Sequence, residues 1–286
     1  MNRGQWRSGV DYVSTRYGLT GWKIFSVLLA AFILAVSLFF VNVCANISSF
    51  WTPVKAYNFP LNDLLNDFFN STSYTVSYNN AIDILLICFC AVTIVVILLN
   101  KNAVYIGLKL IIALTITYTL RCTTLVVTSL PDSWPMGTRS LNHFYSYFGR
   151  DRGGDLIYSG HTLLIVTFAH VWSSFYLITD SYLLHWVLGI LAWAYIIMVM
   201  IFIVVARTHY TIDVLLAVYI ASGVWWSLSY FSTRFFKDPI KDLSFKTREP
   251  TSDVAGPDNA AGPGTGGVAG PGVGGEAAVG DTVISQ

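Results

Sequence analysis

Long apolar runs separated by short polar segments dominate the chain. A membrane-spanning helix needs roughly 20 consecutive apolar residues, and six runs approach or reach that length. These runs cover residues 24–43, 81–99, 103–120, 162–178, 186–206 and 214–231, and the fourth is the shortest. The pattern predicts an all-α integral membrane protein with six transmembrane helices.

Basic residues predict the orientation of these helices. Lys and Arg gather before the first run, in the turn at 100–102 and after the last run, and such an excess marks the cytoplasmic side. Both termini would then be cytoplasmic, and residues 44–80, 121–161 and 207–213 would face the lumen or exterior. Two glycosylation sequons, at Asn46 and Asn70, fall in the first exterior loop. Asn46 lies close to the bilayer, and modification of Asn70 stays open.

Three parts follow from this organisation. Residues 1–23 form a cytoplasmic segment with no evident cleavable signal peptide, and residues 24–231 form a six-helix catalytic domain. Residues 232–286 are first basic and then rich in Gly, Ala and Pro. A stretch of that composition cannot bury a core and is predicted to be a disordered cytoplasmic tail.

Composition supports the membrane class and excludes others. The 286 residues are 54% hydrophobic and 12% charged, whereas soluble domains average about 25% charged residues. The net charge is +1 with scattered basic residues, so no nucleic-acid partner is expected. The four cysteines lack zinc-type spacing, and no metal or other cofactor is expected. Cys44 and Cys122 both lie near exterior ends of apolar runs, which leaves a disulfide open.

Two histidine motifs stand where apolar runs meet water. Ser159, Gly160 and His161 lead into the fourth run, and His209 and Asp213 open the last one. Ionisable groups at such places in membrane proteins are functional by default. His209 and Asp213 share one helical face, so the carboxylate would support the imidazole as nucleophile or base. The backbone N–H groups that begin the fourth helix suit an anion. The motifs together predict phosphate chemistry at a bilayer surface.

Four more residues are candidate substrate contacts beside Ser159 and Gly160. Arg121 and Arg207 would neutralise phosphate, and the alternative for each is ordinary snorkelling to the interface. Asp155 would be a counterion for a cationic headgroup, a partner of the histidines or a helix cap. Tyr158 would hold a quaternary ammonium by a cation–π contact. His170, nine residues beyond His161, is predicted to be a hydrogen-bonded packing residue.

The motifs resemble those of the sphingomyelin synthase family, within the lipid phosphatase/phosphotransferase superfamily. The resemblance rests on residues 154–162 (GDLIYSGHT) and 209–214 (HYTIDV), with support from 121–131 and 60–63, and it covers about residues 20–235. The family usually has Cys-Gly-Asp where this chain has Gly153-Gly154-Asp155. This departure touches no expected catalytic group.

The resemblance implies transfer of a phospho-headgroup from a glycerophospholipid to ceramide, with release of diacylglycerol. His209 would attack phosphorus to give a phosphohistidine, and Asp213 would orient and charge-balance it. His161 would protonate the departing diacylglycerol and then deprotonate ceramide. The protein would reside in the Golgi or plasma membrane with its site on the lumenal or exoplasmic side. A homo-oligomer stays open.

Other functions use the same residues. Phosphocholine and phosphoethanolamine are the favoured headgroups, and an inositol phosphorylceramide synthase is the alternative. A lipid phosphate phosphatase would pass the phosphoryl group to water, but its branch carries an Arg-Pro element that this chain lacks. A non-enzymatic lipid-binding protein is the least favoured, because the histidine–aspartate constellation is intact.

Overall fold

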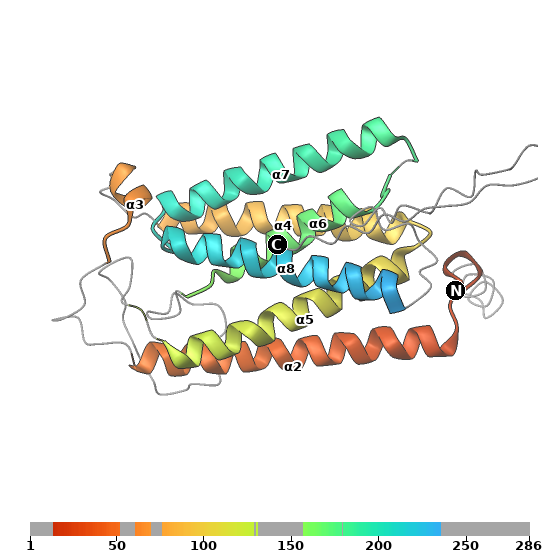
Figure 1. Cartoon of the computed structure of the whole chain (residues 1–286), viewed down its shortest axis with the longest axis horizontal. Helices are drawn as coiled ribbons and strands as arrows, with labels where there is room; N and C mark the ends of the chain where they lie inside the picture. The colour runs from red at the N-terminus through yellow and green to blue at the C-terminus, as the bar shows by residue number, and fades with distance from the viewer. Residues whose placement is uncertain are drawn as a thin grey trace, which may run out of the picture. The chain divides into compact units, whose positions relative to one another are not determined.

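The computed structural model describes residues 14–51, 61–69, 76–128, 130, 157–178 and 180–235. Contacts divide the chain into residues 1–246 and 247–286, and all described residues belong to the first unit. Within the described ranges every regular element is a helix: α2 (Gly21–Trp51), α3 (Leu64–Phe68), α4 (Val76–Leu99), α5 (Ala103–Val127), α6 (Gly160–Ser174), α7 (Tyr182–Val205) and α8 (Thr211–Phe235) (Figure 1). The all-α class predicted from the sequence is therefore confirmed.

Five of the described helices are long and apolar enough to cross a bilayer, namely α2, α4, α5, α7 and α8. They fit an integral membrane protein. The remaining predicted span coincides with α6, which has 15 residues. At the α-helical rise it measures about 22 Å, less than the roughly 30 Å of a hydrocarbon core. Six spans and cytoplasmic termini stay predictions.

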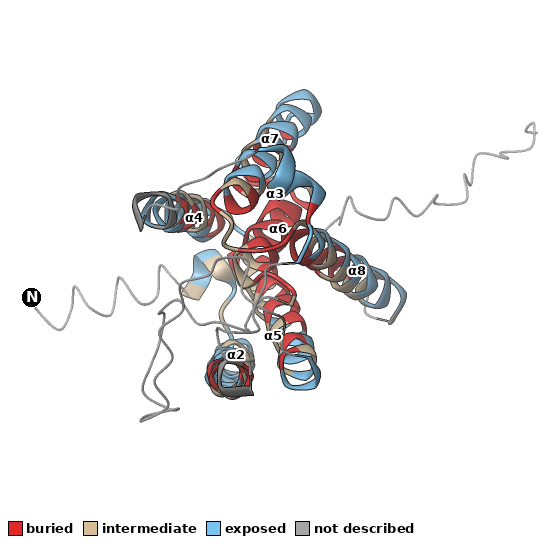
Figure 2. Cartoon of the chain, turned by 90° about the vertical axis from the view of Figure 1, so that its left-hand side faces the viewer, coloured by how far each residue is buried: buried red, intermediate tan, exposed pale blue. Residues whose placement is uncertain are grey.

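The short helix α6 occupies the centre of the bundle. In the end-on view of Figure 2 it is surrounded by α4, α5, α7 and α8, each of which packs against it, while α2 packs on the outer side of α5. Most α6 side chains are buried, from Thr162 through Trp172. Neighbouring helices rather than lipid therefore enclose α6, and they also cover its polar side chains such as Thr167 and His170.

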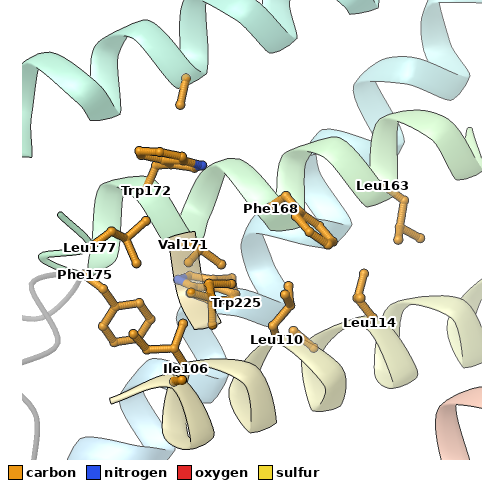
Figure 3. Close-up of a cluster of buried hydrophobic side chains, with 14 of the residues drawn as sticks. Ile106, Leu110, Leu114, Leu163, Phe168, Val171, Trp172, Phe175, Leu177 and Trp225 are labelled. Atoms are coloured by element: carbon orange, nitrogen blue, oxygen red, sulfur yellow. The ribbon is translucent and has the colours of Figure 1, made fainter. Parts of the chain in front are cut away.

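Close packing fixes α6 against its neighbours. Figure 3 shows Phe168 and Val171 of α6 beside Leu110 of α5 and Trp225 of α8, all of them buried. Lipid tails are as apolar as these side chains, so van der Waals packing and interhelical hydrogen bonds hold such helices together. One such interhelical hydrogen bond runs from Trp172 Nε1 of α6 to Thr93 Oγ1 of α4, at 2.9 Å.

Several polar side chains inside the bundle are paired across helices. Lys109 of α5 donates to Ser229 Oγ of α8 at 2.6 Å, and its ammonium lies 4.5 Å from the centre of the Trp225 ring. His170 shares a 2.9 Å hydrogen bond with Ser222 of α8 and stacks on Trp225. The prediction of a packing role for His170 is confirmed.

Several helices extend beyond the predicted apolar runs, because an apolar run marks bilayer depth and not the helix end, whereas α6 ends at Ser174, before the end of its run at 178. α2 continues to Trp51 where the run ended at 43, and it carries Asn46, which is buried. The loop between α2 and α4 is therefore shorter than predicted, and the Asn46 sequon lies within a packed helix. Asn70 lies outside the described residues. Cys44 and Cys122 pack against one α2–α5 cluster, and both are free thiols.

Candidate active site

One end of the bundle gathers the predicted histidines. His161 lies in the first turn of α6, and His209 lies in the turn that joins α7 to α8. Their ring centres are 6.3 Å apart, with ring planes at 64°. His161 is partly exposed, whereas His209 is buried. The structure thus brings two imidazoles from separate motifs next to each other at one end of the bundle.

Asp83 is a member of this site that sequence reasoning missed. Its Oδ1 lies 3.1 Å from His161 Nε2, and both side chains remain about half exposed. The carboxylate comes from the first turns of α4. In the sequence it is only an isolated charge at the edge of an apolar run. The one available signal was its position, since a charge inside a membrane run is a functional candidate by default.

Asp213 organises the start of α8. Its Oδ2 accepts a 3.0 Å hydrogen bond from the backbone N–H of Tyr210. Asp213 is the third residue of α8 and Tyr210 is the residue just before the helix, so this bond is one of the two that form a capping box. Its backbone carbonyl accepts from Ser159 N at 3.3 Å. The carboxylate is buried next to the turn that carries His209. These contacts tie the two histidine motifs directly together.

The start of α6 is built by Ser159 and Gly160. Ser159 is the N-cap, and its Oγ accepts from the backbone N–H of Thr162 at 3.3 Å. Gly160 lies against the guanidinium of Arg121, since a Cβ added there would be 2.6 Å from Arg121 Nη1. Arg121 comes from the last turns of α5 and is buried. A fixed cation therefore meets the positive end of a helix, which is a favourable arrangement for an anion.

Backbone strain marks both histidine motifs. Tyr158 and Arg207 have φ of 70° and 53°, and they are the non-glycine residues with positive φ in the described part of the chain. Such conformations cost about 1–3 kcal/mol each and cluster at functional sites. Each residue directly precedes a histidine turn, so each sets the direction in which the chain enters the site.

Tyr158 is buried rather than exposed to a headgroup. Its phenol donates to the Thr117 carbonyl of α5 at 3.3 Å, and burial raises the pKa of this phenol. The predicted cation–π contact would need an accessible ring face, and the Tyr158 side chain has 0% exposure. Its observed contacts anchor the loop before α6 to α5.

The remaining candidates differ in what the structure records. Arg207 lies in the turn after α7, where its N–H donates to the Val204 carbonyl at 2.9 Å. Asp155 lies outside the described residues. Among the described residues, no group of three or more His, Cys, Asp or Glu side chains is arranged to hold a metal ion.

Comparison with known proteins gives a match to one family model and to several named relatives. Residues 153–230 match the family model described as PAP2 superfamily C-terminal. That range contains His161, His209 and Asp213. Phosphatidylcholine:ceramide cholinephosphotransferase 1 of Caenorhabditis elegans is 29% identical over 157 residues, which are 47% of this chain and 32% of that protein. The proteins of the same name from Gallus gallus and Homo sapiens are 27% and 25% identical over 234 residues, or 75% of this chain and 54% of theirs.

The chain is homologous to these cholinephosphotransferases. The chain spans between about a third and about half of the length of these relatives. The match to the PAP2 superfamily C-terminal model covers both histidine turns.

Proposed function

We propose that the protein is a sphingolipid synthase that transfers a phospho-headgroup from a glycerophospholipid to ceramide. The observation that carries the proposal is the pair of histidines at one end of the bundle. Their ring centres are 6.3 Å apart, and His161 is hydrogen-bonded to the carboxylate of Asp83. The relatives named as cholinephosphotransferases support the same reaction class.

In the proposed first step His209 attacks phosphorus, and the bond from phosphorus to the diacylglycerol oxygen breaks. His161 donates a proton to that oxygen, which leaves as diacylglycerol. In the second step His161 takes the proton from the primary hydroxyl of ceramide while that oxygen attacks the phosphohistidine, so His209 is regenerated. Histidine suits both roles because its pKa lies near neutrality.

Asp83 would hold His161 for this exchange. A hydrogen bond from Nε2 to the Asp83 carboxylate fixes the imidazole tautomer and leaves Nδ1 to give and take the proton. Arg121 would bind the phosphate beside the first turn of α6, with the N-termini of α6 and α8 adding to the positive potential. Asp213, through the turn it caps, would keep His209 directed at phosphorus.

Phosphocholine or phosphoethanolamine is the favoured headgroup. Asp155 precedes the α6 motif and would pair with the cationic end of either headgroup, whereas inositol offers no charge to a carboxylate. Residues 24–231 would form the catalytic domain and 232–286 a cytoplasmic tail. The site would face the lumen of the Golgi or the exterior of the plasma membrane.

Product analysis tests the function. Membranes that contain the protein would be offered a fluorescent ceramide with phosphatidylcholine, phosphatidylethanolamine or phosphatidylinositol, and products would be identified by mass spectrometry. We expect a phosphosphingolipid and diacylglycerol in equal amounts. A parallel sample would be offered phosphatidic acid, and release of free phosphate there, without any phosphosphingolipid in the other samples, would instead indicate a phosphatase.

A histidine variant tests the mechanism. His209→Ala should abolish transfer and prevent trapping of a labelled phosphohistidine. The control is His185→Gln, at the opposite end of α7 from the site, which should retain both. Normal transfer by a folded His209→Ala protein would refute the mechanism.

A further inference from the structure

A short segment after α2 is bonded to the start of α8. Asp63 Oδ2 accepts from the backbone N–H of Thr211 at 2.6 Å, and its Oδ1 accepts from the Thr211 hydroxyl at 2.6 Å. The neighbouring Leu61 N–H donates to the Tyr210 phenol oxygen at 3.0 Å. These residues lie nearly 150 positions apart in the chain, so the contacts join two distant parts of the sequence.

These bonds supply what the sequence of α8 lacks. The residue before the helix is Tyr210, whose side chain cannot accept a bond from the first helical N–H groups as Ser, Thr, Asp or Asn would. Asp63 provides the missing acceptor from another segment. It is 8% exposed, and its Oδ1 also accepts from Leu65 N at the start of α3. One carboxylate therefore accepts hydrogen bonds at the N-termini of two helices, α3 and α8.

The position of His209 depends on this start. His209 lies between the strained Arg207 and the capped residues Tyr210 and Thr211. The end of α7 fixes the turn on one side, and the bonds to Asp63 and Asp213 fix it on the other. Without the Asp63 bonds, the first turn of α8 would lose two acceptors and the imidazole could move relative to His161.

We propose that Asp63 is a positioning residue that holds His209 at the distance and angle needed for attack on phosphorus. This inference rests on the proposed function. Asp63 acts through its bonds to Thr211 in the first turn of α8. Its removal should therefore slow formation of the phosphohistidine and leave the affinity for both lipids unchanged.

Kinetics of three variants test the inference. Asp63→Ala should lower kcat about tenfold to a hundredfold, as expected for loss of hydrogen bonds to a charged group, with KM for donor and ceramide changed less than about twofold. Asp63→Asn keeps one acceptor oxygen and should fall between Asp63→Ala and the unaltered protein. The matched control is Asp67→Ala, an exposed residue of α3, the short helix that follows Asp63, and it should keep full kcat.

A double-mutant cycle separates this inference from the proposed function. Thr211→Val removes the hydroxyl partner, and its effect on the Tm in detergent should shrink strongly when Asp63→Ala is already present. That coupling can be measured even if the unaltered protein makes no phosphosphingolipid, an outcome that would refute the function alone. In an active protein, unchanged kcat in Asp63→Asn and Asp63→Ala, a matching loss in Asp67→Ala, or additive Tm effects would overturn the positioning role.

Discussion

At the scale of single residues, the site depends on carboxylates contributed by other parts of the chain. The two histidine turns are local motifs, and their residue spacing made His161, His209 and Asp213 candidates. Asp83 and Asp63 are 78 and 148 positions from their partners. No periodicity links residues so far apart in one sequence, because their proximity follows only from how the helices pack.

Asp83→Asn should lower the rate of transfer while the protein still folds. The substitution removes the charge that holds His161 Nε2, and charge-assisted hydrogen bonds contribute about 1.5–3 kcal/mol, or roughly tenfold to a hundredfold in rate. The measurement is kcat for ceramide phosphotransfer in mixed micelles. Asp180→Asn, an exposed residue between α6 and α7, serves as the control. Equal rates for both variants would remove Asp83 from the mechanism.

Gly160→Ala should weaken binding of the phosphate. The new methyl group would lie 2.6 Å from Arg121 Nη1, and the buried guanidinium would have to move away from the N-terminus of α6. We expect kcat/KM for the donor to fall about tenfold, as for loss of one charge-assisted contact. Gly107→Ala, on α5 with nothing within 4 Å of the added Cβ, should leave it unchanged. Donor titration with both variants decides the outcome.

At the scale of elements, the apolar runs of the sequence predicted where the six long helices lie, but not the residues at which they begin and end. Each predicted apolar run lies largely within one of α2, α4, α5, α6, α7 and α8. The ends moved because Asn46 and similar polar residues continue a helix when neighbouring helices cover them. The central position of α6 was not predictable, since a largely apolar helix has the same sequence pattern whether lipid or protein surrounds it.

Ser159→Ala should destabilise α6 from its first turn. Ser159 Oγ accepts from Thr162 N and from the Thr162 hydroxyl, and loss of an N-cap side chain costs about 0.5–2 kcal/mol. The expected result is a lower free energy of unfolding and a lower Tm in detergent. Asn102→Ala at the start of α5 removes an N-cap that makes no side-chain capping bond, so it should have a smaller effect. A larger loss for Asn102→Ala would contradict the capping role.

At the scale of the whole molecule, the helices that alternate through the bundle bring their functional ends to one side. The last turns of α5 and the first turns of α4, α6 and α8 supply Arg121, Asp83, His161 and Asp213. The opposite ends carry basic residues such as Arg16, whose guanidinium donates to the Leu99 carbonyl. Several basic residues thus lie away from the histidines, whereas Arg121 and Arg207 lie on the same side as the histidines.

This separation predicts that the catalytic end faces the lumen or exterior. Lys and Arg near the ends of spanning helices favour the cytoplasmic side, and Lys23, Lys101 and Arg234 flank the ends of α2, α4 and α8 that lie away from the histidines. Sequons engineered one at a time into residues 131–156 and into the tail after 251 would report the side of each segment. We expect a glycan, seen as a glycosidase-sensitive shift in mass, only on the first. N-linked glycans are added only on the lumenal side. A glycan on the tail would therefore contradict the predicted orientation and would mean that both histidines face the cytoplasm.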